Sequence, residues 1–252
     1  MAVLSQVVLA FLLAVAGGII SASVGVTHQR LCGLISLAAG TLLGVTLFSI
    51  LPESAEAMRW WETGLALASG YFVFLFISKY VYHVCPACAA SHFDESTTHR
   101  FAEIAAALII ALGIHSTMDG VALAAGHEAS QIGSSRMDLS VLLAVCVHKV
   151  PEGLALGALL LGAGFKRGAT VAWVAAVEST TIVGGLLGLW ALRNVSMFWI
   201  GAVLAHTGGG FVFLAGHAVL GELAKHSKRI VILNFAAGFL LIAILNLVIH
   251  AS

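Results

Sequence analysis

Two short stretches of the 252-residue chain place a histidine four residues before a carboxylate. The first runs from His115 to Asp119, and the second from His148 to Glu152. Residues i and i+4 of an α-helix lie on the same face, so each stretch presents an imidazole and a carboxylate side by side. Two imidazoles and two carboxylates form a ligand set that suits Zn²⁺, and also Fe²⁺ or Mn²⁺. The pattern therefore predicts a divalent-metal site built from two helices.

The elements that must position these groups belong to a very apolar chain. Apolar residues make up 60% of it and charged residues only 10%, against roughly 25% in a soluble domain; the mean hydropathy is +1.03. A net charge of zero argues against nucleic acid as a partner. About 20 apolar residues suffice to cross a bilayer as a helix. The chain is expected to be an all-α polytopic membrane protein, one domain over 1–252, with eight spans at 5–26, 31–51, 64–84, 101–125, 138–163, 169–191, 196–220 and 230–250.

The two histidine–carboxylate stretches fall in the fourth and fifth of these spans. They share one longer pattern, which continues with glycine, an aliphatic residue, alanine and leucine, at 115–123 and 148–156. Consecutive spans run antiparallel, so the repeat predicts an inverted pseudo-two-fold axis with the site near mid-depth. A structural cluster of ion pairs between two helices is the alternative. Ionisable groups at that depth are costly and usually mark a pathway, which favours the metal site.

Lys149 follows His148 directly and lies too deep in its span to reach the membrane surface easily. Its ammonium therefore needs a carboxylate partner, for which Asp119, Glu152 and Glu178 of the sixth span are available. A fixed cation at this point would repel a second metal ion. We expect a single bound ion, with the ammonium in place of a second cation; a purely structural pairing with Glu178 is the alternative and is compatible with that role.

Basic residues near the ends of the spans predict the orientation. Eight lysines and arginines lie in the connections after odd-numbered spans, and three in those after even-numbered spans. The positive-inside rule then places the first set in the cytoplasm and both termini outside, in the plasma or inner membrane of a cell. His206 and His217 in the seventh span are expected either to line the pathway or to form hydrogen bonds between helices. The cytoplasmic segment 83–99, with Cys85 and Cys88, is either a metal-capture segment or an irregular loop.

These residues resemble the paired signature of the ZIP (Zrt/Irt-like) family of divalent-metal transporters, in His115–Gly120 and His148–Gly153. Weaker similarities run through most of the chain, at 39–42 and 49–53, at 177–179 with 184–185, at 209–213 and at 217–222. The resemblance implies the ZIP-like fold, with eight spans and both ends outside. It also implies uptake of Zn²⁺ or a related ion towards the cytoplasm.

The resemblance assigns residues to metal sites as well. His115, Asp119, His148 and Glu152 fall on the family's main metal site. Ser116, Lys149 and Glu178 fall where many members build a second site, and the lysine departs from the asparagine or aspartate often found there.

The leading hypothesis is a transporter, not an enzyme, that works by alternating access and binds its metal between spans 4 and 5. Its partners are Zn²⁺, with Fe²⁺, Mn²⁺ and Cd²⁺ as alternatives, and membrane lipid; the metal is cargo, so no cofactor is expected. The oligomeric state stays open, with a homodimer as one alternative. An intramembrane zinc hydrolase would use the same side chains to activate water. Against it, the sequence contains no His-Glu-x-x-His motif.

Overall fold

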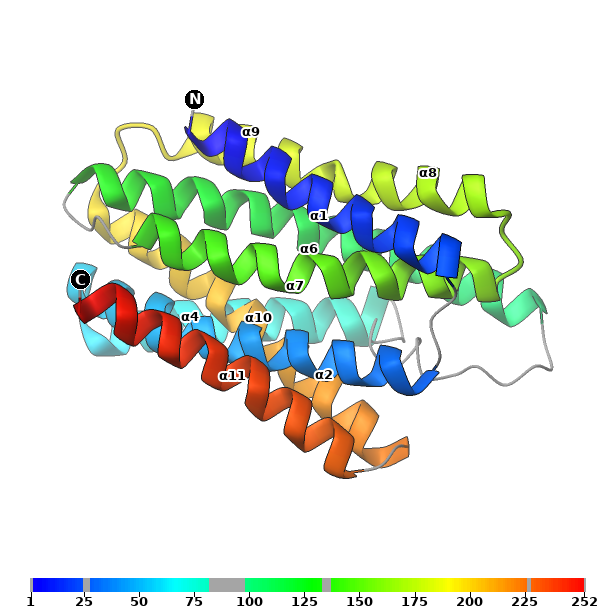
Figure 1. Cartoon of the computed structure of the whole chain (residues 1–252). Coiled ribbons are helices and arrows are strands. Elements are labelled where there is room, and N and C mark those ends of the chain that lie inside the picture. Colours follow the sequence, from blue (N-terminus) through cyan, green and yellow to red (C-terminus); the bar gives the residue numbers. More distant parts are fainter. Residues whose placement is uncertain (1, 25–27, 82–97, 133–136, 226–227, 252) are drawn as a thin grey trace.

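The fold is a bundle of long helices, seen in a computed structural model that describes residues 2–24, 28–81, 98–132, 137–225 and 228–251 (Figure 1). Within these ranges every regular element is helical, as expected from the sequence. The elements are α1 (Ala2–Val24), α2 (His28–Val45), η1 (Thr46–Ile50), α3 (Leu51–Ala57), α4 (Trp60–Phe76), η2 (Ile77–Val81), α6 (Thr98–Ile132), α7 (Met137–Gly162), α8 (Arg167–Glu178), α9 (Thr180–Ala191), α10 (Met197–Lys225) and α11 (Lys228–Ala251). The two η elements are short π-helical turns.

Seven helical segments of the described chain are long and apolar enough to cross a membrane. They match the first three and the last four of the expected spans to within a few residues at most edges. The fourth expected span falls on α6, which is 35 residues long but includes residues 101–108, whose side chains lie outside the described part. Both chain ends lie at the same end of the bundle (Figure 1). We call this end the terminal end.

The outer surface of the bundle is apolar and has tryptophans near the helix ends. Trp60 begins α4, while Trp190 and Trp199 flank the connection between α9 and α10, and all three are more than 60% exposed. These helix ends lie at the terminal end (Figure 1). Tryptophan is enriched at the level of lipid headgroups, because its ring is apolar and its N–H polar. The terminal end is therefore expected to lie at a membrane–water interface.

The helices pack as two groups of close pairs. In the first group α1 packs against α7 and α6 against α9; in the second α2 packs against α11 and α4 against α10. Each pair has two facing glycines at which an added Cβ would meet the partner helix's backbone. These glycine pairs are Gly17 with Gly153, Gly120 with Gly184, Gly40 with Gly238, and Gly70 with Gly209. Small residues let helix backbones approach closely in membranes, where van der Waals packing drives association.

The α1–α7 pair holds one face of the helix that bears His148. Alanine in place of Gly17 would bring its Cβ onto the carbonyl oxygen of Val150 in α7, and a backbone atom cannot move aside as a side chain can. We expect Gly17→Ala to lower the free energy of unfolding by about 1–3 kcal/mol. Gly216→Ala is the matched control, because Gly216 lies inside α10, is exposed and has open space around it. Thermal unfolding of the two purified variants checks this, and equal midpoints would contradict it.

Candidate metal site

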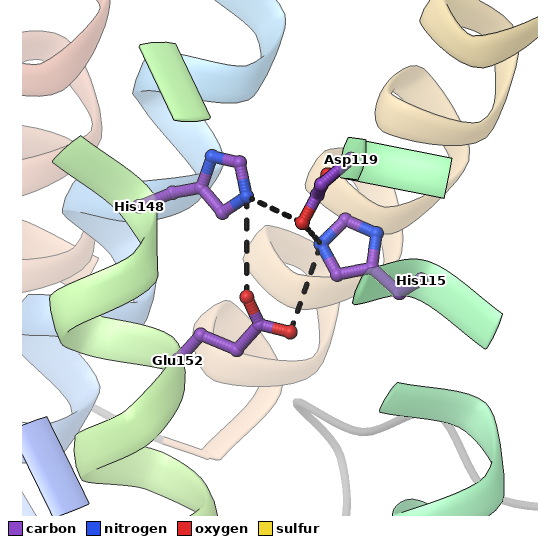
Figure 2. A group of neighbouring side chains, drawn as sticks. All are labelled: His115, Asp119, His148 and Glu152. Atoms are coloured by element: carbon purple, nitrogen blue, oxygen red, sulfur yellow. Dashed lines mark hydrogen bonds and ion pairs between the residues drawn. The ribbon is translucent and has the colours of Figure 1, made fainter. Parts of the chain in front are cut away.

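Four ligand side chains meet where α6 and α7 lie side by side (Figure 2). Helix α6 supplies His115 and Asp119, and α7 supplies His148 and Glu152. One ligand atom from each lies within 4.8 Å of the others. The four side chains are 0–7% exposed. The structure therefore brings together the four residues that the repeated motif predicted to meet.

The spacing of the ligand atoms fits one small cation. Asp119 Oδ2 lies 3.6 Å from His115 Nε2 and 3.3 Å from His148 Nε2. Glu152 Oε1 lies 4.0 Å from His115 Nε2, and its Oε2 lies 3.9 Å from His148 Nε2. Ligands at about 2.0–2.1 Å around tetrahedral Zn²⁺ are about 3.3–3.4 Å apart. Three of the four distances thus exceed the ligand separation around tetrahedral zinc, by about 0.2–0.7 Å, and the two from Glu152 start from different carboxylate oxygens.

The ring nitrogens of His148 are arranged as a metal ligand requires. His148 Nδ1 lies 2.9 Å from the carbonyl oxygen of Ala144 one turn earlier. A carbonyl oxygen only accepts, so Nδ1 carries the proton, and in the neutral ring Nε2 keeps its lone pair. Nε2 then faces Asp119 Oδ2, which is also an acceptor. Two acceptors that converge in a buried place need a proton or a cation between them.

Phe211 of α10, in the second helix group, contacts both imidazoles. Its ring makes edge contacts with His115 and His148, with centroids 5.9 Å and 6.0 Å away, and it is 2% exposed. The motif pairs of α6 and α7 gave no indication of this contact. The sequence placed Phe211 in a span but held no signal that α10 would lie over the ligand group.

Lys149 lies completely buried beside the ligands and contacts all three carboxylates that the sequence offered as partners. Its Nζ is 2.9 Å from Asp119 Oδ2, 2.8 Å from Glu152 Oε2 and 2.9 Å from Glu178 Oε2. It also donates to Ser116 Oγ at 2.8 Å. The ammonium therefore lies at the centre of a polar cluster that adjoins the ligand group and shares two carboxylates with it.

Glu178 belongs to this cluster and lies next to a one-residue irregularity in the sixth span. The sequence predicted one span over 169–191, and the structure has one candidate span at Arg167–Ala191, within which α8 ends at Glu178 and α9 begins at Thr180. Ser179 Oγ donates to the carbonyl oxygen of Ala176, and Thr180 Oγ1 donates to that of Val177 and to that of Gly113 in α6. Such bonds compete with the helical pattern and bend helices. Glu178 itself lies against Ser116, whose hydroxyl donates to its Oε2 at 3.1 Å.

His206 and His217 lie away from the four-ligand group. His206 Nδ1 is 2.8 Å from Ser69 Oγ of α4, an interhelical hydrogen bond of the kind offered as one alternative. His217 Nδ1 bonds the carbonyl oxygen of Phe213 at 3.0 Å, and its ring stacks on that phenyl ring. A pathway role for either histidine stays a prediction. The metal-capture hypothesis for 83–99 concerns side chains outside the described part of the chain.

Comparison with known proteins finds that the chain is similar to zinc transporters. A sequence model of the ZIP zinc transporter family matches residues 87–246, about five-eighths of the chain. Mouse (Mus musculus) "Zinc transporter ZIP13" is 28% identical over 88% of this chain and 71% of its own length. "Zinc transporter YKE4" of Saccharomyces cerevisiae is 26% identical over 77% and 61%, and "Zinc transporter ZIP9" of Xenopus tropicalis is 25% identical over 60% and 59%. The chain thus spans about three-fifths to seven-tenths of the length of these relatives.

Proposed function

The chain belongs to the ZIP zinc transporter family, and from that premise we propose that it transports Zn²⁺ across a membrane into the cytoplasm. Its spans are those of an integral membrane protein. The proposed mechanism is alternating access, in which the ion occupies the group His115, Asp119, His148 and Glu152 and is released to the other face. Fe²⁺, Mn²⁺ and Cd²⁺ are further proposed cargoes, because the same nitrogen and oxygen ligands accept them.

The observation that carries this proposal is the convergence of acceptors around one point. His148 Nε2, held free of its proton by the Nδ1 contact to Ala144, faces two carboxylates in a buried place. A divalent cation relieves the repulsion between these lone pairs and carboxylates. A hydrolase would need the same ion with a position left open for water. The relatives are named as zinc transporters, and no observation favours the hydrolase.

We further propose that this group holds one ion, because Lys149 already places a positive charge in the adjoining polar cluster. Glu178 and Ser116 then serve the ammonium and not a second metal. Both termini are proposed to lie outside, in the plasma or inner membrane, because the basic connections follow odd-numbered spans. We also propose a homodimer. This proposal does not depend on the contacts within one chain.

Uptake into proteoliposomes tests the proposed function directly. The full chain, reconstituted with a fluorescent zinc indicator inside the vesicles, is expected to admit Zn²⁺ down its gradient, with saturable kinetics. Added Cd²⁺, Mn²⁺ and Fe²⁺ are expected to compete, each in proportion to its affinity for the ligand group. Protein-free vesicles give the background rate. Turnover of a lipid or peptide that requires metal, without any ion flux, would instead support the hydrolase.

A further inference from the structure

A second histidine–carboxylate pair lies at the terminal end of the same two helices. His127 of α6 and Asp138 of α7 bring Nδ1 and Oδ2 to within 3.6 Å of each other. Gln6 of α1 donates its Nε2 to the other carboxylate oxygen, Oδ1, at 2.7 Å. Oδ1 is thereby engaged and Oδ2 is left facing the imidazole. This arrangement repeats the histidine–carboxylate spacing of the main ligand group, with a third residue that orients the carboxylate.

Two buried polar atoms around this pair have no hydrogen-bond partner within the described part of the chain. His127 Nδ1 is buried and has no hydrogen-bond partner there, since 3.6 Å is too long for a hydrogen bond. Gln6 is 8% exposed, and its buried Oε1 also lacks a partner among the described residues. Buried polar atoms are normally paired, so two unpaired ligand atoms, Gln6 Oε1 and His127 Nδ1, beside a carboxylate are an arrangement that a bound cation would satisfy. Amide oxygen, imidazole nitrogen and carboxylate oxygen are all ligands for divalent cations.

The pair lies in register with the main ligand group. His115, Asp119, Leu123 and His127 follow each other at intervals of four residues along α6, so each lies about one turn beyond the last, on a row that drifts about 40° around the helix at each step. Eight residues separate Asp119 from His127, which is about 12 Å along the axis at about 1.5 Å per residue. Between the two polar levels lies a layer that we call the apolar plug: Leu123, Val141 and Val145, each at most 1% exposed and part of one buried cluster.

The His127–Asp138 pair is more exposed than the main ligand group, as a site that captures ions from solution requires. The His127 and Asp138 side chains are 20% and 27% exposed, against 6% and 0% for His115 and Asp119. An ion at the outer pair could keep some of its water, while the apolar plug separates it from the inner group. We propose that His127 and Asp138, held by Gln6, form a second divalent-cation site, which takes up the cargo at the terminal end before it reaches the main ligand group. The identity of the cargo and the direction of its movement rest on the proposed function.

A binding measurement tests the site without any transport. The full chain with His148→Ala and Asp119→Asn, which removes two ligands of the main group, is titrated with Cd²⁺ in detergent. We expect one Cd²⁺ per chain to remain bound, and adding His127→Gln to weaken that binding at least tenfold. Glu128→Gln is the matched control, because Glu128 is the next carboxylate on α6 and takes no part in the pair; it should leave binding within twofold. An absence of bound Cd²⁺, or binding that His127→Gln does not weaken, overturns the proposal and leaves a structural pair only.

A transport measurement then places the site on the pathway. In proteoliposomes His127→Gln alone should raise the KM for Zn²⁺ at least fivefold and leave the maximal rate within twofold, because capture is impaired and the main group is intact. An unchanged KM overturns the capture role even if Cd²⁺ binds. If the wild-type chain moves no ion at all, the proposed function fails, while the Cd²⁺ titration still decides whether the outer site exists. Elution of His127→Gln as a single species excludes misfolding as the cause.

Discussion

Conversion of Asp119 to asparagine should reduce Zn²⁺ uptake to the level of protein-free vesicles, a loss of at least about 100-fold. Asp119 Oδ2 is the oxygen nearest to both imidazoles, at 3.6 Å and 3.3 Å. Asparagine keeps the shape of the side chain but removes the charge, and a neutral amide is a much weaker ligand than a carboxylate for Zn²⁺. His148→Ala should have the same effect, since it removes the imidazole of the ligand group whose tautomer is fixed by a backbone carbonyl.

The measurement is initial Zn²⁺ uptake, normalised to the amount of reconstituted protein. Glu128→Gln is again the control, because it removes a carboxylate from α6 outside the ligand group; its rate should stay within twofold of the wild type. Uptake that survives Asp119→Asn in a correctly inserted protein would show that the metal passes elsewhere. In that case the pairing of α6 and α7 would be a structural cluster, the alternative that the sequence left open.

Replacement of Lys149 by methionine should destabilise the metal-free protein by about 3–5 kcal/mol, the usual effect of removing one partner from a buried ion pair. The ammonium contacts three carboxylates within 2.9 Å, and without it Asp119, Glu152 and Glu178 repel one another in a buried place. Methionine has a similar length and fills the same volume, so the loss reports the charge and not a cavity. Thermal unfolding in the presence of a chelator measures it.

Divalent metal should recover much of this loss, because a second ion can take the place of the ammonium. Anomalous scattering from crystals soaked in Cd²⁺ should show one ion between α6 and α7 near the ligand group in the wild type, and two in Lys149→Met. The additional ion is expected beside Ser116, Glu152 and Glu178. Two fully occupied ions near the ligand group of the wild type would refute the idea that the lysine replaces a metal.

The main ligand group could be predicted because local geometry determines it. The spacing of four residues fixes which side chains share a helix face, and the repeat of the motif indicates that the two faces meet. The same reasoning required a carboxylate for Lys149, though it could not choose among three; the structure uses them all. Seven of the eight expected spans could likewise be predicted, since long apolar runs must be helices in a bilayer.

Contacts between segments distant in the chain could not be predicted from the sequence. The irregularity after Glu178 is accompanied by hydroxyl groups that bond backbone carbonyls, one of them on another helix, and hydropathy does not record such bonds. Phe211 covers the imidazoles only because α10 crosses α6. Gln6 and Asp138 are 132 residues apart in the chain, so no spacing rule could join them. Contacts that form where distant helices meet required the three-dimensional structure.

The buried lysine also has an electrical consequence. With neutral imidazoles, three carboxylates and one ammonium give the empty cluster a charge of −2, and one divalent ion brings it to zero. In an alternating-access cycle that carries the cluster through the membrane field, the loaded step would move no net charge, and only the empty return would. Moving one elementary charge across a full potential of 100 mV changes its energy by about 2.3 kcal/mol. A voltage that is negative inside would then push the empty cluster back outward, so that membrane potential would reset the carrier and leave the loaded step untouched.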